Sequence, residues 1–119
     1  MTSSFTGRTA LIVDDEYLIA SMIEDILTRR GITVLTATRP DEARAHLAER
    51  SVDFALIDYQ MRAQPSEEVW TALQEKQIPF AFCTGSLAAE MHSRFPGIMI
   101  IPKPFSEDAI IEVATTLVR

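Results

Sequence analysis

Two adjacent aspartates, Asp14 and Asp15, directly follow a run of apolar residues near the amino terminus. Ionised carboxylates are costly to bring together or to desolvate, so an acid pair at the end of a buried strand is a poor choice for packing. Glu16 comes next, and three negative charges at one turn indicate a positive partner, for which a metal ion is the obvious candidate. The alternative is a solvated loop whose acids favour the amino terminus of the following helix.

Three further polar residues mark the ends of apolar runs later in the chain. Asp58, Thr84 and Lys103 each come at or just after the end of such a run. If the runs are parallel strands of an open sheet, their carboxyl ends form one edge, and ligands bind at that edge in sheets of this kind. The carboxylates of Asp14, Asp15 and Asp58 would then converge on one pocket, flanked by a hydroxyl and an ammonium group.

Each of these groups has a use in phosphoryl transfer. Carboxylates, together with waters and a backbone carbonyl, suit Mg²⁺, which keeps part of its hydration shell in proteins. A carboxylate can also attack phosphorus and form an acyl phosphate. Asp58, at the centre of the expected pocket, is the natural nucleophile. The ammonium of Lys103 and the hydroxyl of Thr84 would stabilise charge on the transferring group.

The apolar runs that must position these residues alternate with helical patterns. Strands are expected at residues 9–13, 32–37, 54–57, 79–83 and 98–101, and helices at 16–30, 40–50, 66–76, 87–94 and from 106 onward. The strands are continuous apolar runs rather than alternating patterns, as expected for a parallel sheet covered on both faces. Right-handed crossovers then give a doubly wound α/β fold with five strands and five helices.

Several residues predict how the helices begin, end and face. The apolar residues of the first helix recur at the helical period and predict a single buried face made of Leu18, Ile19, Met22, Ile23, Ile26 and Leu27. Gly31 is expected to end that helix. The side chains of Thr38, Ser66 and Ser106 are expected to cap the second, third and last helices.

Composition narrows the class of protein. The 119 residues are enough for one domain with one core. The net charge of -6 argues against a nucleic-acid surface and against docking on anionic lipid. The apolar runs are too short to span a membrane, and the amino terminus lacks the apolar region of a secretory signal. The single cysteine, Cys83, predicts a small buried residue rather than a disulfide or a zinc ligand. We therefore expect a cytoplasmic domain.

Taken together, Asp14-Asp15, Asp58, Thr84 and Lys103-Pro104-Phe105 resemble the receiver domain of bacterial two-component response regulators. The resemblance runs from about residue 8 to residue 119 and implies a single receiver domain over residues 1–119. It also implies the flavodoxin-like strand order 2-1-3-4-5, for which a chemotaxis receiver is a standard example.

The resemblance implies a Mg²⁺ site built from four residues. Asp15 would bind the metal directly, and Asp14 would act mostly through water. Asp58 would be a further ligand. The backbone carbonyl of Gln60 would supply the remaining protein contact, which leaves the Gln60 side chain without an assigned role.

The resemblance also implies a phosphorelay function. Asp58 would accept a phosphoryl group from a phosphohistidine on a sensor histidine kinase or histidine phosphotransfer protein. Thr84 would be the switch hydroxyl that turns toward the phosphate, and Lys103 would pair with the phosphate, with a cis Lys103–Pro104 peptide bond. The surface formed by the fourth helix, fifth strand and fifth helix would signal to a protein partner. Turnover of an external substrate is not expected.

Two features depart from the usual receiver pattern, and a third stretch resembles one subgroup of receivers. Ile100 lies three residues before Lys103, where many receivers have an aromatic residue coupled to the switch hydroxyl. The loop at residues 61–65 lacks the usual proline and glycine placement. Residues 79–85 resemble the stand-alone FAT GUY receivers of alphaproteobacteria, except that Cys83 replaces an alanine and Ser86 an aromatic residue.

Other functions are compatible with these residues. The departures would also fit a docking module that ignores phosphorylation, or a phosphate sink. A haloacid-dehalogenase-type phosphohydrolase would need Asp-x-Asp after the first strand, whereas this chain has Asp14-Asp15-Glu16. Flavin binding is disfavoured because the first strand ends in acids rather than in a phosphate-cradling loop. His46 and His92 are expected at the surface and outside the site.

Overall fold

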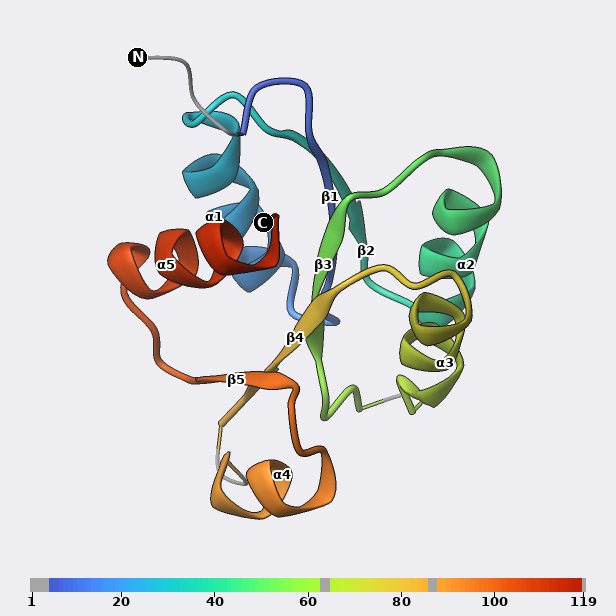
Figure 1. Ribbon diagram of the computed structural model, residues 1–119, viewed down its shortest axis with the longest axis vertical. Coiled ribbons are helices and arrows are strands. Elements are labelled where there is room, and N and C mark those ends of the chain that lie inside the picture. The colour runs from blue at the N-terminus through green and yellow to red at the C-terminus, as the bar shows by residue number, and fades with distance from the viewer. Residues whose placement is uncertain (1–4, 63–64, 86–87, 119) are drawn as a thin grey trace.

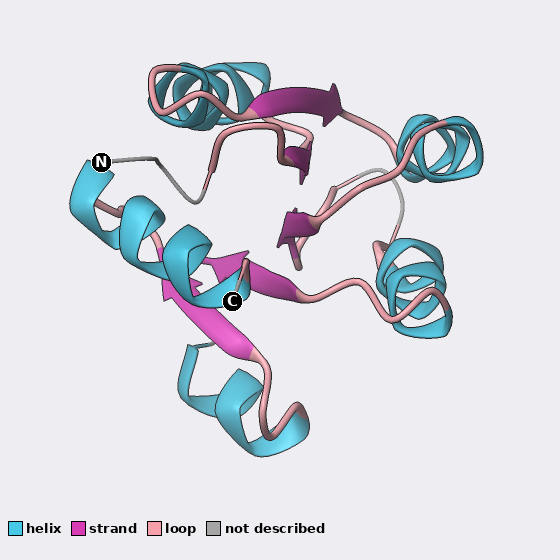
Figure 2. Cartoon of the chain, turned by 45° about the horizontal axis from the view of Figure 1, so that its top comes forward, coloured by secondary structure: helices cyan, strands magenta, loops and turns pink. Residues whose placement is uncertain are grey.

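The protein is a twisted parallel sheet with helices on both faces (Figures 1 and 2). The computed structural model describes residues 5–62, 65–85 and 88–118. Ser86, the expected start of the fourth helix at residue 87, and residues 63–64 of the irregular loop lie outside them. The five strands are β1 (Thr9–Val13), β2 (Thr33–Ala37), β3 (Phe54–Asp58), β4 (Phe80–Thr84) and β5 (Met99–Pro102). Their order is β2-β1-β3-β4-β5, and every neighbouring pair is parallel, which confirms the predicted fold.

Each strand is followed by a helix. The helices are α1 (Tyr17–Thr28), α2 (Pro40–Glu49), α3 (Glu67–Glu75), α4 (Ala88–Arg94) and α5 (Glu107–Leu117). In Figure 1, α1 and α5 lie together on one side of the sheet, and α2 and α3 lie together on the other. No helix among the described residues is long and apolar enough to cross a membrane.

The alternation of side chains along the central strands builds two cores. In β1, Ala10 and Ile12 join a cluster with buried residues of α1 and α5. Leu11 and Val13 face the opposite way, into a cluster with α2, α3 and Met91 of α4. Successive strand residues point to opposite faces of a sheet, so a continuous apolar run supplies both cores at once. The backbone at the carboxyl edge is held between two packed layers.

The buried face of α1 is narrower than predicted. Leu18 is 81% exposed and Met22 45% exposed, so their assignment to the core is wrong. Ile23, Ile26 and Leu27 are buried as predicted, Ala20 joins them, and Ile19 is partly buried against the same core. Leu18 and Met22 are four residues apart and share a flank of the helix that no other element covers within the described chain. An apolar side chain at helical spacing therefore did not guarantee burial.

One of the three predicted caps is formed as expected. The Ser106 hydroxyl accepts a hydrogen bond from the Ala109 N–H at 3.1 Å. Ser66 occupies the cap position of α3, but its hydroxyl donates to the Tyr59 carbonyl at 3.4 Å. The α2 helix begins at residue 40, as predicted, but Arg39 rather than Thr38 occupies its cap position.

Glu42 stabilises the start of α2, and Gly31 follows the end of α1. The Glu42 carboxylate accepts hydrogen bonds from both the backbone and the hydroxyl of Thr38, at 3.0 Å each, so a side chain inside the helix reaches back to its entrance. Gly31 has the predicted left-handed conformation after α1, with a φ of +88°.

Candidate functional site

The carboxyl edge of the sheet gathers the predicted residues. Asp14 directly follows β1, whereas Asp58 and Thr84 are the last residues of β3 and β4. The strands pair in register, with Asp58 beside Cys83 and Thr84 beside Pro102, so Lys103 emerges next to Thr84. Its backbone N–H donates to the Thr84 carbonyl at 2.8 Å. Strand ends that are far apart in sequence thus meet at one place, as the parallel-sheet argument predicted.

Lys103 is the positive centre of the site. Its ammonium nitrogen lies 3.0 Å from Asp14 Oδ2, 3.6 Å from Asp58 Oδ1 and 3.9 Å from Glu16 Oε1. Burial works against the charged form of the side chain, but the hydrogen bond to Asp14 and the charges of Asp14 and Asp58 outweigh it. The pKa of Lys103 is raised, so the ammonium stays charged near neutral pH. The Lys103–Pro104 peptide bond is cis, as the resemblance implied.

Asp58 is a buried carboxylate with unusual proton affinity. Only 4% of the residue is exposed. Burial is the largest cause that raises its pKa, and the charge of Asp14 adds to it. Lys103 and the hydrogen bond from the Gln60 N–H, at 3.1 Å, act in the opposite direction. The net result is a pKa raised to about 6. A further positive charge beside Asp58 would therefore stabilise the ionised form of this carboxylate.

Asp14, Asp15 and Glu16 form a tight cluster of possible metal ligands. One carboxylate oxygen from each lies within 4.8 Å of the others. Asp14 is buried and uses its two oxygens to accept from the Glu16 N–H at 2.9 Å and from Lys103. Asp15 Oδ2 accepts from the Arg62 N–H at 2.7 Å, which ties the loop after β3 to the acid pair.

This donor set fits Mg²⁺. Oxygen ligands from a few carboxylates, with room for waters, are what the ion prefers. The measured cluster contains Glu16 and leaves out Asp58, whereas the sequence reasoning grouped Asp58 with Asp14 and Asp15. The Lys103 ammonium lies within 4 Å of Asp14, Asp58 and Glu16, so it contacts Asp58 as well as two members of the cluster.

Thr84 and Gln60 are linked through their side chains. The buried Thr84 hydroxyl donates to Gln60 Oε1 at 3.4 Å. Sequence reasoning assigned only the backbone of Gln60 and missed this contact, because nothing in the local pattern indicates where an exposed amide will point. Ile100, at the position of the missing aromatic residue, is half-buried and packs against the apolar cluster under α2 and α3.

The cysteine and the two histidines of the chain have no role assigned in this site. Burial raises the pKa of the Cys83 thiol to about 12, which fits its interpretation as a small apolar residue. His92 is exposed, as predicted. His46 is half-buried rather than at the surface, and its Nε2 lies 3.0 Å from the Thr36 carbonyl oxygen.

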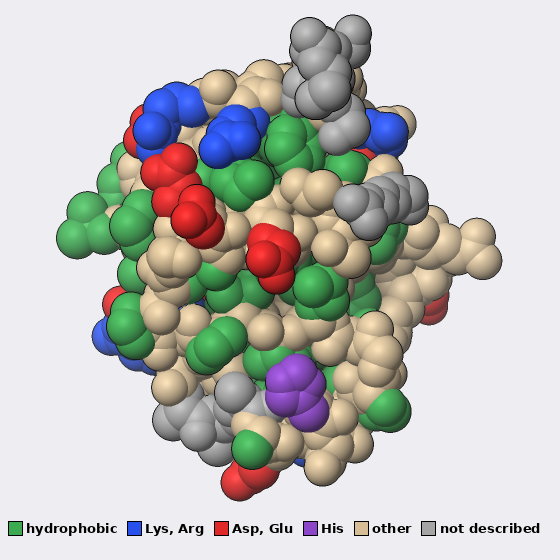
Figure 3. All heavy atoms as spheres, turned by 60° about the vertical axis from the view of Figure 1, so that its left-hand side comes forward, with side chains coloured by type: hydrophobic (Ala, Val, Ile, Leu, Met, Phe, Trp, Pro, Cys, Tyr) green, Lys and Arg blue, Asp and Glu red, His purple; other side chains and the backbone are tan. Residues whose placement is uncertain are grey.

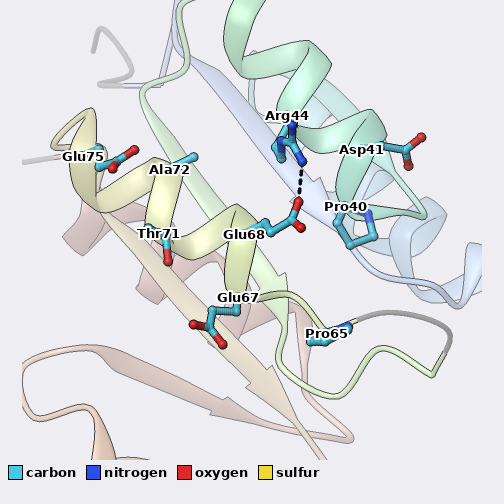
Figure 4. A pocket seen from close by; sticks show the side chains of 9 residues that line it. All are labelled: Pro40, Asp41, Arg44, Pro65, Glu67, Glu68, Thr71, Ala72 and Glu75. Carbon is cyan, nitrogen blue, oxygen red and sulfur yellow. Dashed lines mark hydrogen bonds and ion pairs between the residues drawn. The ribbon is translucent and has the colours of Figure 1, made fainter.

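A large hollow in the described part of the surface lies elsewhere. It measures about 870 Å³ and lies between α2 and α3, where Arg44 is paired with Glu68 (Figure 4). Four of the nine residues around it are acidic, and none of the nine belongs to the carboxyl-edge site. Size alone therefore does not locate the chemistry in this molecule.

The fold and the edge residues define a class of protein, and comparison with known proteins identifies it. The response regulator receiver domain model matches residues 10–115, so the chain belongs to this family. The phosphate regulon transcriptional regulatory protein PhoB of Pseudomonas aeruginosa is 28% identical over 122 residues, covering 95% of this chain and 52% of that protein. The chain thus spans about half the length of the curated relatives it matches.

Solved structures agree on the fold. SdrG from Sphingomonas melonis Fr1 is 33% identical, with a TM-score of 0.80 over 99% of this chain and 100% of that one. The receiver domain of NtrX from Brucella abortus is 24% identical, with a TM-score of 0.82 over 92% of this chain and 97% of that one. The FAT GUY subgroup remains a prediction.

Proposed function

We propose that this chain is the phosphoacceptor of a two-component phosphorelay and that Asp58 takes the phosphoryl group. One observation carries the proposal: Asp58 is buried at the carboxyl edge, 3.6 Å from a charged lysine and beside the Asp14-Asp15 pair. The donor would be a phosphohistidine of a sensor histidine kinase or a histidine phosphotransfer protein in the cytoplasm. In the transfer, an Asp58 oxygen forms a bond to phosphorus while the bond from phosphorus to the histidine nitrogen breaks.

The other site residues would support that transfer. Asp14 and Asp15, with Asp58 and the Gln60 carbonyl, would hold Mg²⁺, which supplies positive charge for the phosphoryl oxygens. Lys103 would give up part of its pairing with Asp14 to contact the incoming group. Thr84 would exchange its contact with Gln60 for a phosphoryl oxygen. We expect self-phosphorylation and self-dephosphorylation on Asp58, without turnover of an external substrate.

Removing the acceptor tests this directly. Asp58→Asn should abolish Mg²⁺-dependent labelling by acetyl phosphate and by a kinase, because an amide cannot form the acyl phosphate. The measurement is incorporation of labelled phosphate with and without EDTA. Asp108→Asn, at an exposed position in the first turn of α5, is the matched control and should label like wild type. Equal labelling of Asp58→Asn and wild type would contradict the assignment.

The exposed apolar flank of α1 fits the docking of a protein donor. Tyr17, Leu18 and Met22 are 72%, 81% and 45% exposed, and Tyr17 begins the helix directly after the acid cluster. Figure 3 views the side of the molecule with α1 and α5, where hydrophobic side chains reach the surface beside acidic ones. Uncovered apolar side chains next to a reactive carboxylate suit a partner helix that carries the phosphohistidine.

We therefore predict that Leu18→Ser slows phosphotransfer from a protein donor by about ten- to a hundredfold, since burying a leucine at an interface contributes about 1.5–3 kcal/mol. Transfer from acetyl phosphate should not change, because that donor needs no docking surface. Ala48→Ser, at an exposed position on α2, controls for a polar substitution away from the site. Equal loss with both donors would place the defect in the active site instead.

A second function is favoured by the contacts of Thr84 and Ile100. The Thr84 hydroxyl is engaged by Gln60, and the half-buried Ile100 side chain offers no polar atom for a relay. A docking module that ignores phosphorylation, or a phosphate sink, would suit such a site. Partner capture with and without beryllofluoride, a phosphoryl analogue, separates this function from that of a signalling receiver. Only a signalling receiver should change its partner binding when the analogue is added with Mg²⁺.

A further inference from the structure

Tyr59 directly follows Asp58 and makes contacts that the phosphoryl chemistry does not use. Its hydroxyl accepts a hydrogen bond from Arg94 Nη1 at 2.7 Å. The guanidinium carbon of Arg94 also lies 5.6 Å from the centre of the Tyr59 ring. Arg94 is the last residue of α4. A residue adjacent to the reactive carboxylate is thus tied to the end of a helix from another part of the chain.

The Tyr59 ring extends this connection through aromatic contacts. It meets Phe82 of β4 edge-on at 5.4 Å between ring centres, and Phe95, which follows α4, at 5.8 Å. Phe82 and Phe95 are themselves 5.0 Å apart. Trp70 of α3 contacts both of them, at 6.1 Å and 5.4 Å. Aromatic rings in contact constrain one another, so a displacement of Tyr59 should also displace Phe95, the residue directly after α4.

The backbone at Tyr59 is placed to respond to the state of Asp58. On one side the Tyr59 N–H donates to the Cys83 carbonyl at 3.1 Å, and on the other the Gln60 N–H donates to Asp58 Oδ1. Bonding a phosphoryl group to an Asp58 oxygen changes the charge and the hydrogen bonds at this short segment. Tyr59 is the first residue after Asp58 whose side chain makes contacts outside the site.

We propose that Tyr59 and Arg94 transmit the phosphorylation state of Asp58 to α4, in place of a relay through residue 100. The inference rests on the proposed function, because it assumes that Asp58 is the group that changes. It requires two arrangements of α4 relative to Tyr59 whose balance depends on the state of Asp58. The Arg94 hydrogen bond belongs to one arrangement, so its removal should separate events at the site from events at α4.

Hydrogen exchange of the peptide covering residues 88–95, with and without Mg²⁺ and beryllofluoride, measures this separation. In wild type, the analogue should change exchange both there and in residues 54–62. In Tyr59→Phe and in Arg94→Gln the change at 88–95 should be about tenfold smaller, while that at 54–62 stays. The double variant should show no further loss, as expected for two residues that act through one contact.

The chain supplies a matched control. Arg44→Gln removes an exposed arginine that pairs α2 with α3. This variant should respond like wild type. An unchanged response of residues 88–95 in Tyr59→Phe would overturn the inference and leave the proposed function intact. A wild-type protein in which residues 54–62 ignore the analogue would contradict the proposed function, and the inference with it.

Discussion

Replacing Lys103 by glutamine is expected to slow Mg²⁺-dependent phosphorylation of Asp58 by about 10²–10³-fold, the usual cost of removing one group aimed at developing charge. The ammonium is the positive group that contacts Asp14, Asp58 and Glu16 together. Without it, the charge on the transferring group and on Asp14 and Asp58 would depend mainly on the metal ion, whereas Glu16 would keep its ion pair with Arg62. The measurement is the initial rate of labelling by acetyl phosphate at saturating Mg²⁺.

The same variant should be less stable, because the buried Asp14 carboxylate loses a charged hydrogen-bond donor. The expected loss in the free energy of unfolding is about 1–3 kcal/mol at neutral pH without metal. Lys76→Gln is the matched control, since Lys76 is the chain's other lysine and is exposed at the end of α3. Wild-type labelling by Lys103→Gln would show that the ammonium has no part in the reaction.

Because of Asp58, the free energy of unfolding of the metal-free protein should decrease as the pH is raised from about 4 to about 6. Its pKa is raised from 3.8 to about 6 in the folded protein, first by burial and then by the charge of Asp14. In this range the folded state holds more protons than the unfolded state, so raising the pH weakens folding. Above about pH 6 the loss is complete and amounts to roughly 2–3 kcal/mol.

Comparison with Asp58→Asn isolates this contribution. The variant keeps the size of the side chain but cannot ionise, so its advantage over wild type should grow from near zero at pH 4 to its full value at pH 7. Urea unfolding at several pH values in EDTA measures the difference. Added Mg²⁺ should reduce it, because positive charge favours the ionised carboxylate. Parallel stability curves for the two proteins would mean that Asp58 titrates normally in the fold.

The fold and the edge residues followed from the sequence because topology alone places them. Each apolar run predicted a buried parallel strand, and a parallel sheet brings all its carboxyl ends to one edge. No knowledge of side-chain orientation was therefore needed to group Asp14, Asp58, Thr84 and Lys103. The strand order itself came from resemblance, and the paired strands agree with it.

Contacts that depend on orientation were not predictable in this way. Leu18 and Met22 match the helical period but lie on a flank that no element covers. The hydrogen bond from Arg94 to Tyr59 joins residues 35 apart, and no local pattern signals where α4 ends relative to the loop after β3. The Glu42 side chain accepts a hydrogen bond from the Thr38 N–H before the start of α2, in a conformation that residue spacing does not determine. These are the contacts through which the site reaches its surroundings.

The most direct test of the central claim is to locate the acyl phosphate. Protein treated with acetyl phosphate and Mg²⁺ can be reduced with borohydride, which converts a phosphorylated aspartate to homoserine, and the peptides then read by mass spectrometry. Homoserine is expected at residue 58, dependent on Mg²⁺, with Asp14, Asp15 and Asp53 unmodified. Homoserine at another aspartate, or at none after full exposure to the phosphodonor, would contradict the assignment of Asp58 as the acceptor.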